Sequence, residues 1–183
     1  MKATQQLKDE HEGVKVMLGI LEQVCKQLEK TGTLNKEHFE RILGFLKIFV
    51  DRCHHGKEEE LLFPALEAAG VPKDGSIRVM LQEHELGRKY IRIMSDAFAG
   101  FTIGDKSASQ NIVQNTLAYI NLLRDHIEKE NNVLFAMGDR LLSKNIQDEL
   151  YEGFEKIEEE RIGIGKHEEL HHLLEEISGI YLN

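Results

Sequence analysis

Two segments of this 183-residue chain repeat one pattern: a histidine, three residues, a glutamate, two residues, an aliphatic residue, leucine and phenylalanine. The copies run from His54 to Phe63 and from His126 to Phe135. A shorter Glu-His-Glu segment precedes each copy, at residues 10–12 and 83–85. The histidine of each short segment precedes that of the next copy by 43 and 42 residues. The chain therefore resembles one helical hairpin used twice.

A spacing of four residues places two side chains on one face of a helix, one turn apart. His54 and Glu58 should therefore point the same way, as should His126 and Glu130. Both pairs lie in stripes that are otherwise apolar, so we expect them to face the core. The stripes are Leu46, Val50, His54, Glu58, Leu62 and Ala118, Leu122, His126, Glu130, Leu134. Apolar residues also flank the lone histidines: Leu7, Val14 and Leu18 around His11, and Met80 and Ile91 around His84.

The sequence predicts an all-α protein, because helix-forming residues are plentiful, prolines number two, and no segment alternates apolar with polar residues. Short connections between four long helices favour an up-down-up-down bundle over residues 1–143. Residues 144–183 should add two C-terminal helices packed on the same domain. The expected helices are about residues 3–30, 35 to the mid-sixties, 76–99, 106–142, 145–161 and 166–181, with Pro64 and Gly70-Val71-Pro72 ending the second.

Two buried carboxylates and four imidazoles that converge in one bundle need a compensating positive charge, because an unpaired buried carboxylate costs several kcal/mol. No lysine or arginine lies on the same stripes. A pair of metal ions would supply the charge, and imidazole and carboxylate ligands without thiolate suit iron, manganese or zinc. The predicted ligands are His11, His54, Glu58, His84, His126 and Glu130.

Other interpretations stay open. A single His-x-x-x-Glu pair is usually a surface helix pair, and the repeat could record a duplicated packing unit without a ligand. Glu59 could replace Glu58, because it lies four residues after His55. Two six-coordinate ions with an oxygen bridge would leave about two positions beyond the six predicted ligands. His55 and His167 are the candidates for those positions.

The segment from Cys53 to Pro64 resembles the second-helix signature of the hemerythrin-like family, also called the HHE cation-binding domain, and His126 to Phe135 resembles its partner on the fourth helix. The resemblance implies a four-helix bundle with an oxo- or hydroxo-bridged di-iron centre that reacts with dioxygen or related species. It assigns four terminal ligands and two bridges. The terminal ligands are His11, His54, His84 and His126, and the bridges are Glu58 and Glu130.

Two positions depart from the oxygen-carrying members of that family. Arg88 stands where they have a second histidine on the third helix. Their fourth-helix carboxylate is an aspartate five residues after the histidine, whereas here Glu130 lies at four and Asn131 at five. The chain is therefore more similar to the divergent branch, which is associated with oxygen or redox sensing, iron handling and peroxide or nitric oxide chemistry.

Composition narrows the function. A formal net charge of −9 argues against a nucleic-acid binder, and no apolar run has the length of a membrane span. The polar N-terminus predicts no signal peptide, and two cysteines predict no disulfide framework, so we expect a cytoplasmic protein. The leading hypothesis is a di-iron module that binds or senses dioxygen or redox state. The alternatives are an enzyme acting on hydrogen peroxide or nitric oxide, and an iron store.

Overall fold

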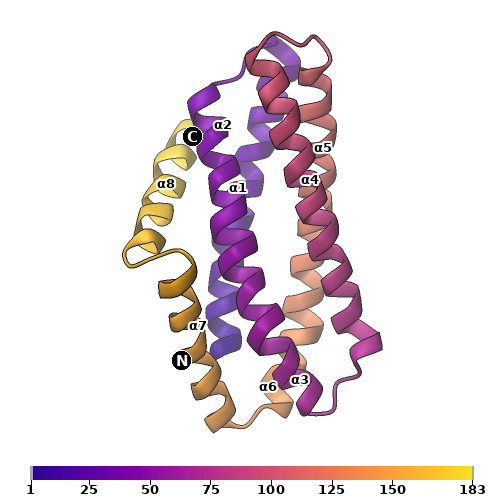
Figure 1. The fold of residues 1–183 in the computed structure, drawn as a ribbon, viewed down its shortest axis with the longest axis vertical. Helices are drawn as coiled ribbons and strands as arrows, with labels where there is room; N and C mark the ends of the chain where they lie inside the picture. The colour runs from indigo at the N-terminus through magenta and orange to yellow at the C-terminus, as the bar shows by residue number, and fades with distance from the viewer. Residues whose placement is uncertain (1, 183) are drawn as a thin grey trace.

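The computed structural model describes residues 2–182, which form six helical runs with no strand among them (Figure 1). The first run is α1 (Ala3–Thr31), and the second joins α2 (Lys36–Phe45), η1 (Leu46–His55), η2 (Glu58–Leu62) and α3 (Phe63–Ala68). The third joins η3 (Lys73–Ile77) to α4 (Arg78–Thr102), and the fourth joins α5 (Ala108–Lys129), η4 (Glu130–Leu134) and α6 (Phe135–Leu141). The last two are α7 (Lys144–Arg161) and α8 (Lys166–Tyr181).

The first four runs lie side by side in alternating directions, so the prediction of an all-α bundle with two extra C-terminal helices is confirmed (Figure 1). α5 packs against both α4 and α1. The expected break at Pro64 was wrong. Pro64 lies at the start of α3, directly after the wider π-helical turn of η2, and the run continues to Ala68.

A layer of histidine and glutamate divides the buried core into two apolar clusters. Along α1, Leu7 belongs to one cluster and Val14 to the other, with His11 between them. Along the second run, Val50 and Leu62 lie in different clusters on either side of the His54 pair. The apolar clusters above and below this layer exclude water from it. The polar side chains of the layer therefore lie in surroundings of low dielectric constant.

Two of the four helical runs that carry predicted ligands, the second and the fourth, depart from α-helical geometry near those ligands. η1, η2 and η4 are π-helical segments, and they contain His54, Glu58 and Glu130. A π-turn holds more residues than an α-turn, so consecutive side chains are separated by less than the about 100° of an α-helix. Neighbours such as His54 and His55 can therefore both face the interior, and both are buried.

The C-terminal helices cover one side of the bundle. α7 and α8 pack against α1, and α7 also contacts η1 and η2 (Figure 1). Phe154 of α7 and Ile177 of α8 are fully buried, so both helices join the core through an apolar face. Among residues 2–182, no helix is both long and apolar enough to cross a membrane.

Candidate metal centre

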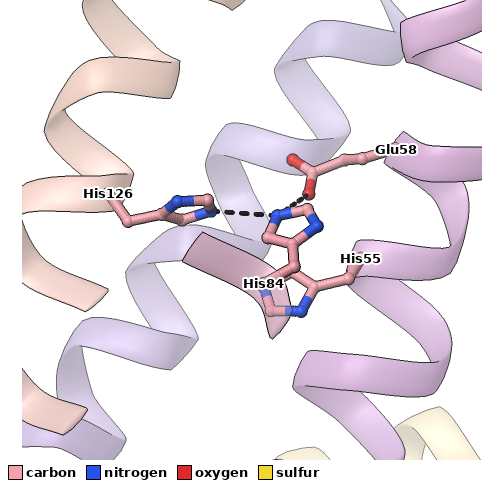
Figure 2. A group of neighbouring side chains, drawn as sticks. All are labelled: His55, Glu58, His84 and His126. Atoms are coloured by element: carbon pink, nitrogen blue, oxygen red, sulfur yellow. Dashed lines mark hydrogen bonds and ion pairs between the residues drawn. The ribbon is translucent and has the colours of Figure 1, made fainter. Parts of the chain in front are cut away.

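Four imidazoles from four helical runs meet in two pairs at the middle of the bundle. Nε2 of His11 lies 2.9 Å from Nε2 of His54. Nε2 of His84 lies 3.1 Å from Nε2 of His126, and Figure 2 shows this second pair. Each of these residues is only 1% exposed. The fold therefore aims the same ring nitrogen of all four histidines at one another, inside the protein.

Two glutamates join the histidine pairs. Glu58 lies with Oε1 3.4 Å from Nε2 of His54 and with Oε2 3.4 Å from Nε2 of His84. Glu130 lies with Oε2 3.3 Å from Nε2 of His11 and with Oε1 3.3 Å from Nε2 of His126. Each carboxylate thus presents one oxygen to each pair, which is the arrangement of a bridging ligand.

These groupings define two potential cation sites, here called site 1 and site 2. Site 1 consists of His11, His54, Glu58 and Glu130, and site 2 of His55, Glu58, His84 and His126, with the ligand atoms of each group within 4.8 Å of one another. Metal–nitrogen bonds of about 2.1 Å at right angles place two nitrogens about 3.0 Å apart. The separations of 2.9 and 3.1 Å therefore suit two imidazoles on one ion.

Every histidine of the two facing pairs is oriented by an oxygen at its other ring nitrogen. Nδ1 of His54 donates to Glu10 and Nδ1 of His126 to Glu83, at 2.7 and 2.9 Å. Nδ1 of His84 donates to Glu59 at 2.7 Å, and Nδ1 of His11 donates to Asn131 at 2.9 Å. Since Nδ1 carries the proton, the Nε2 lone pair faces inward, as in metal-bound histidines.

The orienting residues repeat with the ligands. Glu10 and Glu83 precede the lone histidines. Each accepts the Nδ1 hydrogen bond of the second histidine in its own hairpin, His54 or His126. Glu59 and Asn131 follow the two shared glutamates. Each accepts the Nδ1 hydrogen bond of the lone histidine in the other hairpin, His84 or His11. These orienting roles were not predicted from the sequence. The Glu-His-Glu segments contained the signal, since their first glutamate is part of the repeat.

Aromatic rings complete the repeated unit. Phe63 stacks on His84 with ring centroids 5.9 Å apart, and Phe135 stacks on His11 at 5.4 Å. Each phenylalanine ends one copy of the pattern and packs on the lone histidine of the other hairpin. The sequence pattern thus extends from ligand to packing residue.

His55 breaks the symmetry. It is 4% exposed, its ring stacks on His84 with centroids 3.8 Å apart, and its Nδ1 has no hydrogen-bond partner (Figure 2). Burial and the neighbouring imidazoles hold the pKa of His55 well below its ordinary value, so it stays neutral and keeps a lone pair for a metal. The equivalent position in the second copy is Ile127.

Three other residues considered in the sequence analysis, Glu59, Arg88 and His167, lie outside sites 1 and 2. Glu59 orients His84 rather than replacing Glu58. Arg88 binds Glu59 at 2.6 Å and Asp51 at 2.7 Å, so it supports an orienting carboxylate. His167 belongs to neither group, and its Nδ1 lies 2.7 Å from Oε1 of Glu158 on α7.

Protons balance the buried charge when no metal is bound. Burial lowers the pKa of His54, but Glu58 and Glu10 outweigh this effect and raise the pKa to about 10. Burial also lowers the pKa of His126, and Glu130 chiefly raises it to about 10. Burial raises the pKa of Glu130, yet the surrounding imidazoles hold it well below its ordinary value. Two imidazolium ions thus face two carboxylates.

The donor set fits a cation better than it fits protons. All four oxygens of Glu58 and Glu130 are buried without a hydrogen-bond partner, which is costly for carboxylates. Within residues 2–182, their ion-pair partners are imidazoles only. Cations between the paired Nε2 atoms would satisfy these oxygens and the histidine lone pairs together.

We expect the metal-free and metal-loaded proteins to respond oppositely to pH. His54 and His126 have raised pKa values when folded, so their stabilisation is full below about pH 6.5 and disappears as pH rises toward 10. Metal competes with those protons, so its stabilisation grows over the same range. The gap between the two melting temperatures, measured at about pH 6.5, 8 and 9.5, should widen by several degrees. Parallel curves would contradict proton–metal competition.

Comparison with known proteins agrees with this geometry. Residues 2–138 match the family described as the hemerythrin HHE cation binding domain. The chain is also 26% identical over 162 residues to uncharacterized proteins of Mycobacterium tuberculosis and Mycobacterium bovis, which covers 88% of this chain and 63% of each relative. The chain therefore spans less than two thirds of the length of the curated relatives it matches. The family match ends before α7 and α8.

Proposed function

Because this chain belongs to the hemerythrin HHE cation-binding domain family, we propose that sites 1 and 2 hold two iron ions that together bind or sense dioxygen. Iron is a redox-active metal that suits imidazole and carboxylate ligands, and the family resemblance favours it over manganese or zinc. When bound, the pair supplies reversible electron exchange with a small oxygen-containing ligand. The protein supplies the coordination, the orientation of the imidazoles and a dry surrounding.

The observation that carries this proposal is the sharing of both carboxylates. Glu58 belongs to both metal-ligand groups, and Glu130 directs its two oxygens to histidines of both pairs. A single structural ion would bind one group of ligands. The other four-residue group would then remain buried without a compensating cation, which destabilises the folded protein. Two ions use every buried ligand atom, and the shared carboxylates keep them adjacent.

The two sites differ in their imidazoles. Site 2 has His55 in addition to its facing pair, whereas Ile127 stands at the equivalent place of the second hairpin and is buried among apolar side chains. If both glutamates bridge, site 1 has two imidazoles and two carboxylates and site 2 has three imidazoles and two carboxylates, so an ion at site 1 retains more positions for an external molecule. This difference supports ligand binding over a purely structural role.

Burial restricts the ligand to small molecules. The six residues predicted from the sequence are at most 1% exposed, so a bulky substrate has no access to the metal without a large opening of the bundle. Dioxygen, peroxide and nitric oxide all meet this size limit. We favour reversible binding or sensing because the described ligands are already oriented by hydrogen bonds and stacked rings, which keeps the centre rigid.

The direct test is a gas-cycling experiment on reduced, iron-reconstituted protein. We expect two irons per chain and an absorbance change that appears in air and reverses under nitrogen over several cycles. Glu58→Gln should show neither signal, whereas Glu60→Gln, at an exposed neighbouring carboxylate, should behave like the native chain.

Other results would assign a different role. Sustained gas evolution from peroxide, or sustained consumption of nitric oxide, would favour the enzyme. Release and uptake of iron without any gas response would favour the store. A protein that holds no iron, or a single zinc, after expression with ample iron would refute the di-iron centre itself.

A further inference from the structure

A third pair of facing imidazoles lies on α8, apart from the metal centre. His167 and His171 are four residues apart on one helix face, and their Nε2 atoms approach to 2.7 Å. This is the same relationship that the two pairs in the centre show, at 2.9 and 3.1 Å. In the metal-free protein one Nε2–H donates to the other Nε2, and a metal ion that displaces this proton would bind both lone pairs.

The pair opens onto an acidic pocket between α1, α7 and α8. The pocket has a volume of about 260 Å³, and both imidazoles line it. Carboxylates from α1 and α7 also line it: Asp9, Glu10, Glu155 and Glu158. Negative charge around two imidazoles favours a bound cation over a bound anion.

Glu158 orients the imidazole of His167. Oε1 of Glu158 lies 2.7 Å from Nδ1 of His167, and Oε2 accepts a hydrogen bond from Lys57 at 3.0 Å. This contact is an ion pair without the hydrogen-bond geometry that joins Glu10 to His54. Its negative charge still favours the proton on Nδ1 and leaves the Nε2 lone pair for a metal.

We propose that His167 and His171 form a separate binding site for one divalent transition-metal ion on the surface of the C-terminal helices. The two Nε2 atoms are the ligands, water completes the coordination, and the pocket carboxylates contribute negative charge without binding the ion directly. Histidine pairs one turn apart on a helix bind transition metals through one face. Imidazole selects zinc, nickel, copper or ferrous iron over magnesium and calcium, which prefer oxygen.

The proposed site differs from the centre in access. His171 is exposed and His167 is partly exposed, whereas the ligands of the centre are buried. Metal on α8 should therefore exchange quickly with solution and should leave the buried centre unchanged. The site also lies outside the matched residues 2–138, so it is a property of the C-terminal helices.

Nickel titration of the iron-reconstituted full chain tests the proposal, with calorimetry as the readout and the iron absorption spectrum as a monitor of the centre. We expect one Ni²⁺ per chain, with binding weakened at least about tenfold in His167→Ala and in His171→Ala. The matched control is His172→Ala, because His172 is on the same helix with its side chain 82% exposed. It should bind Ni²⁺ like the native chain.

The outcomes separate this site from the centre. The Ni²⁺ site should persist in Glu58→Gln even if iron is lost, so failure of the di-iron proposal leaves this test intact. Circular dichroism should show unchanged helix content in the α8 variants. No Ni²⁺ binding, equal binding in His167→Ala, or loss of binding in His172→Ala would each overturn the proposal.

Discussion

Replacing Glu58 with glutamine should remove both metal ions at once. Each oxygen of Glu58 faces a different histidine pair, so one substitution removes a charged ligand from both sites. Changes to residues that only orient ligands cost about 10- to 100-fold in metal affinity, so loss of this shared carboxylate should cost more than about 100-fold. Metal analysis after gel filtration should find almost no iron.

Thermal unfolding gives a second measure of the same substitution. Metal at about 100 times its dissociation constant stabilises a folded protein by about 2.7 kcal/mol, which corresponds to roughly 5–10 °C in a chain of this size. Glu58→Gln should lose this metal-dependent increment in melting temperature. Glu60→Gln should keep it, because Glu60 binds Arg161 at the surface of the native protein and lies outside both sites. Full iron content in Glu58→Gln would show that Glu58 is not a bridge.

Replacing Lys57 with methionine should destabilise the protein strongly, although Lys57 contacts no metal ligand. Its side chain is fully buried and its Nζ lies 2.6 Å from Glu10 and 3.0 Å from Glu158. Burial raises the pKa of Glu10, but His54 and Lys57 outweigh it and lower the pKa to about 2. Methionine keeps the volume and removes the charge, so Glu10 and Glu158 lose the buried ammonium group that they share. The expected cost is about 3–5 kcal/mol, or roughly 6–20 °C in melting temperature.

The repeat supplies the matched control. Lys129 stands where Lys57 does, three residues after the histidine, and it binds Glu83 as Lys57 binds Glu10. Its side chain is 41% exposed, so water screens the charge that Lys129→Met would leave. A surface pair is worth about 0–1 kcal/mol, so this variant should melt within a few degrees of the native chain. Equal losses in the two variants would show that burial is not the cause.

The two lysines show what a sequence repeat cannot reveal. Lys57 and Lys129 occupy equivalent positions in two segments that share one pattern, yet only Lys57 is buried. The difference comes from α7, which brings Glu158 beside Lys57 and places the Phe154 ring 6.0 Å from its Nζ. The burial of Lys57 by α7 cannot be predicted from either segment, because α7 is about 100 residues away from Lys57 in the sequence.

The sequence by itself determined the helices, the core-facing stripes and the six residues that converge, because each depends on spacing within one helix and on the cost of burying charge. Only the tertiary structure decided which imidazoles pair, which oxygens orient them, and that His55 joins one site. Those outcomes depend on contacts between helices, and on π-turns that rotate His55 inward. A periodic pattern fixes the direction of a side chain on its own helix, whereas its partner is fixed by how the helices pack.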